Sequence, residues 1–301
     1  MGNKKYSGVI IPTVTPLNES FQLDVHALEK MFAHFYAHDA LPFILGTTGE
    51  AASFSQAFKI NFLHEAGKLK KANTLLYAGI SSNCIEESIA LAAAAKDAGV
   101  DVVVATIPNY YALTEEQTFN YFETLANASA IPLIIYNIPA TTHVSLSLDV
   151  IDKLSKHPNI VGCKDSERSD ERLAQSLLLW KDRKDFSFFV GWAARSAPAL
   201  IAGADGIIPS TGNVVASIYK KMIDAVASGD DNTAHAMQVL SDSAGAVYQE
   251  GKTLGQSLWA LKTLMHHCKL CAPIVQAPLL PMHANEAAVL IQNFEKINFN
   301  S

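Results

Sequence analysis

Short apolar runs recur along the chain, and an amphipathic stretch follows almost every one of them. Their spacing is mostly about 30 residues, the size of one strand followed by one helix. This alternation predicts a parallel sheet whose strands are joined by helical crossovers. The apolar runs are residues 8–14, 41–45, 74–78, 101–105, 132–136, 159–163, 186–190 and 203–208.

Polar residues mark where the intervening helices start and stop. Asp24 is a suitable N-cap for a helix that runs to His38. Thr114 precedes two glutamates and a glutamine, which suits a capped helix with an acidic first turn. The alanine-rich stretch 85–98 ends at Gly99, a residue typical of helix C-termini.

Eight alternations favour a closed (β/α)8 barrel over an open doubly wound sheet. No Gly-x-Gly-x-x-Gly follows the first strand, and polar motifs follow several strands rather than one switch point. The alternation ends near residue 227, and the stretches 230–248, 253–268 and 283–297 have helical patterns. We therefore predict a catalytic barrel over residues 1–227 and a C-terminal helical extension over residues 228–301.

Composition limits the cellular location and the kinds of partner that we expect for the protein. The chain has 301 residues, of which 49% are hydrophobic and 17% charged, enough for a large core. A net charge of -6 argues against nucleic acid and anionic membranes as partners. No apolar run approaches the ~20 residues of a membrane span, the N-terminal segment lacks a signal-peptide pattern, and four cysteines are too few for a disulfide framework. We expect a cytoplasmic protein.

The strand predicted at residues 159–163 runs directly into Lys164. An amine that is held at the end of a buried strand is partly desolvated, which lowers its pKa and leaves a neutral nucleophile for carbonyl groups. An ion pair of Lys164 with Asp165 or Glu167 is an alternative interpretation of the same stretch. The lysine alone does not decide between the two.

Other strand ends carry chemistry that is consistent with a nucleophilic lysine. Thr47 and Thr48 lie between Gly46 and Gly49, where hydroxyls and backbone N–H groups suit a small carboxylate, although a plain tight turn has the same composition. The fifth strand ends at Tyr136, a phenol for proton transfer. Together these groups describe a Schiff-base enzyme for a 2-keto acid.

The motifs and their order resemble the dihydrodipicolinate synthase / N-acetylneuraminate lyase family. The resemblance covers nearly the whole chain, and it rests on Gly46-Thr-Thr-Gly-Glu50, Tyr136-Asn-Ile-Pro139, Gly162-Cys-Lys164-Asp and residues 8–16 and 203–213. It implies a (β/α)8 barrel with a helical C-terminal region. It also implies class I aldolase chemistry without a metal or an organic cofactor, in a homotetramer built as a dimer of dimers.

The resemblance assigns roles to particular residues. Lys164 would form the imine with pyruvate or another 2-keto acid, and Tyr136 would move protons. Thr47 would link Tyr136 to Tyr110, which would reach in from a neighbouring subunit. The residues implied to hold the carboxylate and to line the pocket are Gly46, Thr47, Thr48 and Ile208.

The second substrate is where the sequence departs from its relatives. Thr141 stands where the synthase branch has an arginine for the aldehyde's carboxylate, and a threonine cannot form that bidentate charged pair. Gly191 is followed by Trp192 instead of the acidic pair that the sialic-acid lyases use. Ser166 and Ser210 remain as candidate binders of substrate hydroxyls. His143 and Arg195 are further candidates, with a plain loop histidine and a structural charge as the alternatives.

These observations lead to a first hypothesis and to alternatives. The first is an aldolase that cleaves a 2-keto-3-deoxy sugar acid into pyruvate and a hydroxy-aldehyde. One alternative is 4-hydroxy-tetrahydrodipicolinate synthase, which condenses pyruvate with aspartate semialdehyde. A catalytically inactive keto-acid-binding protein is an alternative of another class. A metal-dependent aldolase is disfavoured, because the ten histidines show no spacing that gathers ligands.

Overall fold

All the strands are parallel, and they close into a barrel in which each strand pairs with its neighbours in the sequence and β8 pairs with β1. A computed structural model describes residues 4–299. The strands are β1 Gly8–Pro12, β2 Ala40–Ile44, β3 Tyr77–Gly79, β4 Val102–Ala105, β5 Leu133–Asn137, β6 Ile160–Asp165, β7 Ser187–Val190 and β8 Gly206–Ile207. The predicted (β/α)8 barrel is confirmed, and each predicted strand overlaps an observed one.

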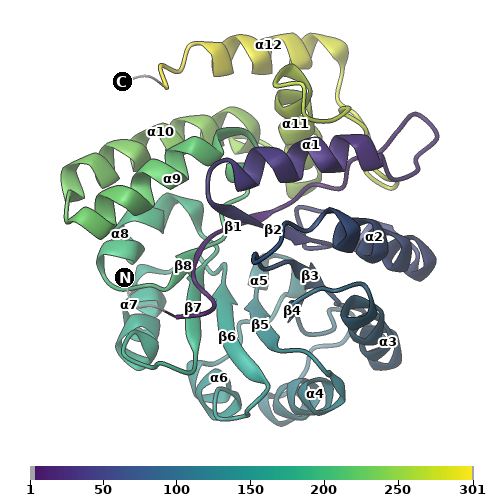
Figure 1. Cartoon of the computed structure of the whole chain (residues 1–301), viewed down its shortest axis with the longest axis vertical. Coiled ribbons are helices and arrows are strands. Elements are labelled where there is room, and N and C mark those ends of the chain that lie inside the picture. The colour runs from purple at the N-terminus through teal and green to yellow at the C-terminus, as the bar shows by residue number, and fades with distance from the viewer. Residues whose placement is uncertain (1–3, 300–301) are drawn as a thin grey trace.

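Helices follow the strands and form a ring around the barrel (Figure 1). They are α1 Val25–Tyr36, α2 Gln56–Leu69, α3 Ile85–Asp97, α4 Glu115–Ala128, α5 Pro139–Thr142, α6 Leu148–Leu154, α7 Asp170–Trp180, α8 Ser196–Ile201 and α9 Gly212–Ser228. Two short 3-10 turns, η1 Ala51–Ser53 and η2 Ala193–Arg195, follow β2 and β7.

The polar residues that predicted the helix starts act as caps. The Asp24 side chain accepts a hydrogen bond from the Ala27 N–H at 2.9 Å. Thr114 and Gln117 form a reciprocal capping box at the start of α4. Each satisfies backbone N–H groups that the first helical turn cannot pair.

Side chains that alternate along the strands build two layers of core. One layer fills the barrel interior and includes Ile10, Phe43, Tyr77, Val104, Ile134, Tyr136, Phe189 and Ile208. The other lies between the strands and the outer helices, where Ile135 and Cys163 point. Because adjacent residues face opposite layers, the phase of each strand decides which side chains reach the interior.

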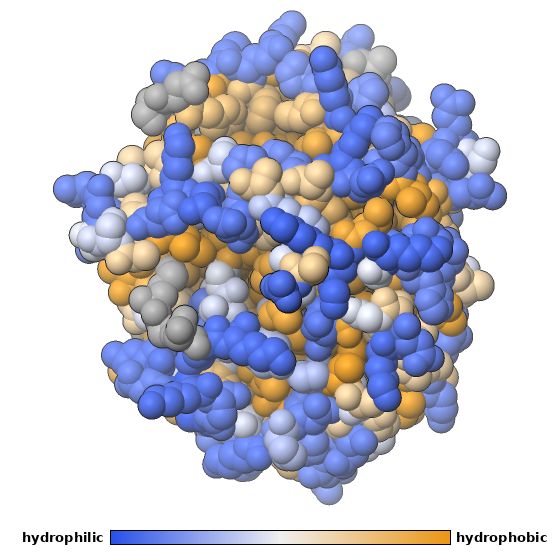
Figure 2. Space-filling model, viewed as in Figure 1, coloured by the Kyte–Doolittle hydropathy of each residue, from blue (hydrophilic) through white to orange (hydrophobic). Residues whose placement is uncertain are grey.

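Helices α10 Asp231–Gln249, α11 Leu254–His267 and α12 Ala284–Glu295 follow the barrel and gather at one side of it (Figure 1). Polar side chains cover most of the face seen in Figure 2, with apolar surface in the recesses between them. None of the helices within residues 4–299 is long and apolar enough to cross a membrane.

Candidate active site

Tyr136 and Lys164 are paired residues on the neighbouring strands β5 and β6. After Leu133 the pairing shifts by one residue, so that Ile134 lies opposite Gly162. A shift of one residue moves every later side chain of a strand to the other face. The irregularity therefore places the Lys164 side chain on the inner face, beside Tyr136.

Gly162 makes this irregularity possible, because no side chain fits there. A Cβ atom on Gly162 would lie 2.5 Å from the Ser187 carbonyl oxygen and 3.4 Å from the Phe189 ring. Sequence reasoning missed this role, although a glycine inside a predicted strand is a known signal of a bulge or of close backbone approach.

The amine of Lys164 is buried against aromatic rings. Its Nζ atom lies 3.8 Å from the centre of the Tyr136 ring and 5.1 Å from the centre of the Phe43 ring. The residue is only 3% exposed, and no carboxylate within residues 4–299 forms an ion pair with it. Burial lowers the pKa of Lys164, and Tyr136 opposes part of this effect. The surroundings favour the neutral, nucleophilic amine.

The two acidic residues after Lys164 are bound to other partners. Asp165 accepts hydrogen bonds from Arg172 Nε at 2.7 Å and from Asn137 at 3.1 Å. Glu167 accepts from the same Asn137 side chain at 3.0 Å and lies 3.4 Å from Arg172 Nε. Burial raises the pKa of Asp165, and the Arg172 guanidinium counteracts the rise. The ion-paired interpretation of Lys164 is therefore wrong in this structure.

The turn after β2 lies against the same aromatic ring as the amine. A Cβ atom on Gly46 would approach the Phe43 ring to 3.1 Å, and Lys164 Nζ lies over that ring. Thr47 and Thr48 are half-buried, and their hydroxyls and backbone N–H groups have no hydrogen-bond partner in the described part of the chain. These groups are free to bind a ligand. Phe43 is a site residue that sequence reasoning did not identify.

Ser166 and Gly191 border the two principal side chains. The Ser166 hydroxyl donates a hydrogen bond to the Tyr136 phenol oxygen at 3.4 Å. A Cβ atom on Gly191 would lie 2.0 Å from that hydroxyl oxygen and 3.1 Å from Cε of Lys164. Ile208 is buried in the barrel interior together with Tyr136. The structure thus gathers Ser166 and Gly191 around the lysine and the tyrosine, and it places Ile208 in the same interior core cluster as the tyrosine.

Other predicted residues lie outside this cluster or are bound to the scaffold. Tyr110 is 78% exposed, and its phenol forms no hydrogen bond within residues 4–299. The Ser210 hydroxyl is bound to the Tyr248 phenol at 2.7 Å. Thr141 lies in the short helix α5, where its hydroxyl donates to the Ile138 carbonyl at 3.4 Å.

The two charged candidates for the second substrate also differ in their surroundings. Arg195 forms an ion pair with Asp170 at 2.6 Å and stacks its guanidinium over the Trp192 ring at 4.5 Å. His143 is exposed and ends α5 in a left-handed conformation. Arg195 therefore already has a carboxylate partner, which favours the interpretation of Arg195 as a structural charge.

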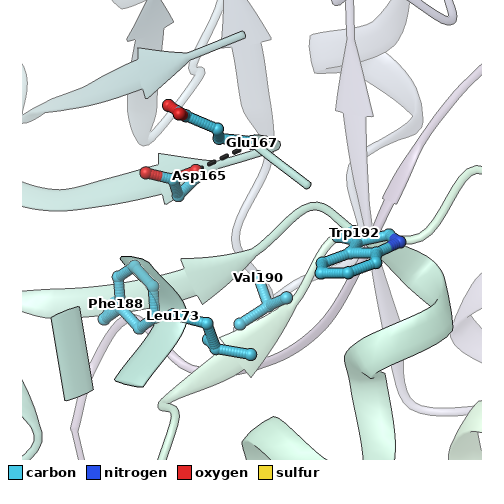
Figure 3. Close-up of a pocket in the computed structure, with 6 residues that line it drawn as sticks. All are labelled: Asp165, Glu167, Leu173, Phe188, Val190 and Trp192. Atoms are coloured by element: carbon cyan, nitrogen blue, oxygen red, sulfur yellow. Dashed lines mark hydrogen bonds between the residues drawn. The ribbon is translucent and has the colours of Figure 1, made fainter. Parts of the chain in front are cut away.

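Two hollows are present away from the Lys164 amine. One is small, about 10 Å³, and lies on the outer side of β6 and β7, lined by Asp165, Glu167, Leu173, Phe188, Val190 and Trp192 (Figure 3). That is about the least volume that holds one water, so it is too small for a keto acid. The other, a groove of about 430 Å³ between α11, the proline-rich loop and α12, contains none of the predicted site residues. Within residues 4–299 no cluster of three or more His, Cys, Asp or Glu side chains is arranged for a metal ion.

Comparison with known proteins identifies the family of the chain. Residues 5–296 match the model of the dihydrodipicolinate synthetase family. The chain belongs to this family. It is 32% identical, over 75% of its length and 76% of the relative's, to an uncharacterized DapA-like lyase of Thermofilum pendens. It is 28% identical to 4-hydroxy-tetrahydrodipicolinate synthase of Neisseria gonorrhoeae, over 91% of this chain and 93% of that enzyme.

The family also has this architecture. Dihydrodipicolinate synthase from Bacteroides thetaiotaomicron superposes with a TM-score of 0.90 at 28% identity, covering 98% of this chain and 99% of that one. Enzymes of the dihydrodipicolinate synthetase family are pyruvate-dependent lyases that use a lysine Schiff base. Family membership therefore supports a lyase or aldolase, and it leaves the substrate open.

Proposed function

We propose that the protein is a class I aldolase in which Lys164 forms a Schiff base with pyruvate or another 2-keto acid, without a metal or an organic cofactor. The observation that carries the proposal is the amine of Lys164, which is buried beside Tyr136 with a lowered pKa and without a carboxylate partner. A desolvated lysine with these neighbours is suited to attack a carbonyl carbon.

The chemistry follows from the atoms around the lysine. The amine adds to the keto carbon, and loss of water gives a protonated imine. The bond that breaks joins the carbon next to the imine to the carbon that carries a hydroxyl: the hydroxyl loses its proton and leaves as the aldehyde, and the imine accepts the electron pair of the broken bond to become an enamine. Protonation of the enamine carbon and hydrolysis of the imine by water then release pyruvate and restore the lysine. Tyr136 is close enough to the amine to transfer protons, and the Ser166 hydroxyl on its phenol oxygen gives that proton a partner.

The turn after β2 supplies the binding site for the keto acid's carboxylate in this proposal. The free hydroxyls and N–H groups of Thr47 and Thr48 offer four donors, and Gly46, which precedes them, packs against the Phe43 ring. Backbone N–H groups in a turn bind anions well. Phe43 and Ile208 form apolar walls beside the reacting carbon.

The exposed Tyr110 supports assembly into a dimer of dimers. Its ring packs edge-on against Tyr111 at 4.9 Å, and both are more than 70% exposed in the single chain. In the proposal, Tyr110 reaches into the site of a neighbouring subunit and relays protons to Tyr136 through Thr47, whose hydroxyl has no hydrogen-bond partner among the described residues of the single chain. A tetramer is therefore part of the proposal. We also propose a cytoplasmic location, and a catalytic region over residues 1–227 followed by a helical region over residues 228–301.

A 2-keto-3-deoxy sugar acid is the substrate class that we favour. Ser166 places a hydroxyl at the edge of the site, above the lysine side chain and against Tyr136. A hydroxyl at that position suits an aldehyde that carries hydroxyl groups. Thr141 and Ser210 are weaker candidates for the same task, because their hydroxyls bind the Ile138 carbonyl and the Tyr248 phenol, whereas the partner of the Ser166 hydroxyl is Tyr136 beside the amine.

The synthase alternative needs a cation for the carboxylate of aspartate semialdehyde. Arg172 and Arg195 are both engaged by carboxylates. Arg168, in the loop after β6, is exposed and forms no ion pair within residues 4–299. Arg168 is therefore the guanidinium that this alternative would use, and Arg168→Ala should then raise the KM for the semialdehyde while leaving pyruvate binding unchanged.

Reductive trapping tests the central step. The protein is incubated with pyruvate and borohydride, and intact mass is measured beside a Lys164→Ala control and a sample without borohydride. We expect the wild type alone to gain the mass of one reduced pyruvyl group, and peptide mapping to place it on Lys164. An adduct on the Ala variant, or none on the wild type, would contradict the proposal.

A substrate screen then separates the candidates. Wild type and Ser166→Ala are tested with 2-keto-3-deoxy sugar acids of different lengths, and pyruvate release is followed. We expect release from at least one, with a higher KM and, because Ser166 also binds the Tyr136 phenol, a lower kcat in the Ser166 variant, while trapping at saturating pyruvate persists. Condensation of pyruvate with aspartate semialdehyde at an ordinary enzymatic rate would establish the synthase instead. Trapping without turnover of any aldehyde would favour the keto-acid-binding protein.

A further inference from the structure

The turn proposed to bind the keto acid's carboxylate begins and ends in a strained conformation. Leu45 and Glu50 flank it, and both have left-handed backbones, with φ of 55° and 56°. For residues other than glycine this conformation is strained, and it persists only where the surroundings hold it. The shape of the turn therefore depends on what fixes its two ends.

Backbone from β3 and a side chain from the β1–α1 loop fix part of the turn. The Cα atom of Gly79 lies so close that a Cβ atom there would meet the Leu45 carbonyl oxygen at 1.9 Å. The Thr15 hydroxyl donates to the Gly49 carbonyl at 2.6 Å. Neither contact reaches Glu50.

Glu50 is held by the C-terminal helical region instead. Its carboxylate forms an ion pair with Lys262 of α11 at 2.5 Å and accepts the Gln276 N–H at 2.7 Å. Lys262 also donates to the Ile274 carbonyl at 2.6 Å. Both charged side chains are 0% exposed. Two charges that are withdrawn from water in this way are costly unless each is fully paired, so this contact is strongly specified.

The contact lies at the far side of the turn from the reacting lysine. Glu50 follows Thr47 and Thr48, and its N–H donates to the Thr47 carbonyl at 3.1 Å. At the other end of the turn, Gly46 packs on the Phe43 ring that lies beneath Lys164. A shift of the Glu50 backbone would therefore be transmitted to the donors of Thr47 and Thr48.

We propose that Glu50 is a positioning residue, and that its buried pair with Lys262 lets the C-terminal helices set the affinity of the turn for the substrate's carboxylate. This inference rests on the proposed function. It differs from a purely structural role in one respect: loss of the pair weakens ligands that carry the carboxylate and spares those that lack it.

Glu50→Gln tests the proposal, and Asp205→Asn is its matched control. Asp205 forms a largely buried ion pair with Lys4 at 2.8 Å, with side chains 6% and 10% exposed, at the opposite end of the barrel, before β8 begins. For each variant, the pyruvate concentration that gives half-maximal borohydride trapping on Lys164 is measured, together with Tm. We expect a rise of about tenfold for Glu50→Gln, the size of one weakened hydrogen bond to a charged group, and no change for Asp205→Asn.

Hydroxyacetone has a keto group and no carboxylate, so it can form the imine without using the carboxylate-binding turn. It therefore distinguishes a specific effect on that turn from a general loss of structure. We expect its half-maximal trapping concentration to be the same in wild type and Glu50→Gln, and maximal trapping at saturating pyruvate to be preserved. Equal weakening of pyruvate and hydroxyacetone, or an unchanged pyruvate concentration in Glu50→Gln, would overturn the inference. Wild-type protein that traps neither compound overturns the proposed function, and this inference with it.

A double variant keeps the test decisive if Glu50→Gln does not fold. Glu50→Gln with Lys262→Met removes both buried charges, and neutral replacement of a whole buried pair is often tolerated. It should show the same selective rise for pyruvate. An unchanged pyruvate concentration in this variant would also overturn the inference.

Discussion

Lys164 and Lys262 are both buried, 3% and 0% exposed, but their surroundings differ. The Lys262 amine meets the carboxylate of Glu50 and the carbonyl of Ile274. The Lys164 amine meets the rings of Tyr136 and Phe43 and no carboxylate in the described part of the chain. Burial alone therefore does not mark a nucleophile. A buried lysine without a carboxylate partner is the better candidate nucleophile, because burial then favours the neutral amine with no nearby negative charge to oppose it.

Removal of Lys164 should have the largest effect on activity. Lys164→Met keeps the shape of the side chain and removes the nucleophile, so turnover should fall about 10⁴-fold or more. The variant should fold at least as stably as wild type, because a desolvated amine is replaced by an apolar group. Aldolase assays and thermal unfolding check both points. A Met variant that retains a tenth of the activity would place the nucleophile elsewhere.

Lys262→Met should show the reverse pattern. It leaves the Glu50 carboxylate buried without its partner, which typically costs about 3–5 kcal/mol of folding free energy. Trapping of pyruvate on Lys164 at saturating concentration should persist in the folded protein. Urea unfolding measures the loss of folding free energy, and borohydride trapping measures imine formation on Lys164. Loss of trapping without loss of stability would mean that the two lysines have exchanged the roles assigned to them here.

Gly162→Ala should lower both the folding stability and the catalytic activity, each to a smaller extent than the lysine variant that affects it most. The added Cβ would lie 2.5 Å from the Ser187 carbonyl, and overpacking of this kind costs about 1–3 kcal/mol. Because Gly162 lies where β6 changes register, a displaced Lys164 should lower kcat/KM about 10–100-fold. Gly245→Ala is the control, since its nearest contact would be an ordinary 3.6 Å. Equal kcat/KM in both variants would show that the irregularity does not place the lysine.

The sequence was sufficient for the barrel, its strands and the candidate nucleophile. Apolar runs alternate with amphipathic stretches over most of the chain, and this pattern depends only on local residue order. The sequence alone leaves an ion pair of Lys164 with Asp165 or Glu167 as an alternative interpretation. In the structure Arg172 and Asn137 take both carboxylates.

Contacts between distant segments were beyond sequence reasoning. Glu50 and Lys262 are more than two hundred residues apart, and nothing local in either segment identifies the other. Ser210 and Tyr248 are 38 residues apart, and no local pattern connects them either, although their hydrogen bond occupies a hydroxyl that is a candidate binder of substrate. Sequence reasoning also missed the irregularity in the pairing of β5 with β6, which changes the face to which the later side chains of β6 point, Lys164 among them.

The smallest expected effect is a difference in pH dependence of stability, and it reports directly on the Lys164 charge. Burial lowers the pKa of Lys164 below its ordinary 10.5. Between the two values the unfolded chain binds more protons than the folded one, so the free energy of unfolding rises with pH in that window.

Lys164→Met should therefore exceed wild type in stability by a constant amount below the lowered pKa, and by a shrinking amount as pH approaches 10.5. Urea unfolding of both proteins between neutral pH and about pH 10 measures this difference, and Lys262→Met provides the comparison. A difference between Lys164→Met and wild type that stays the same over the whole range would mean that the folded amine titrates like an exposed lysine, and the contrast between the two buried lysines would then be lost.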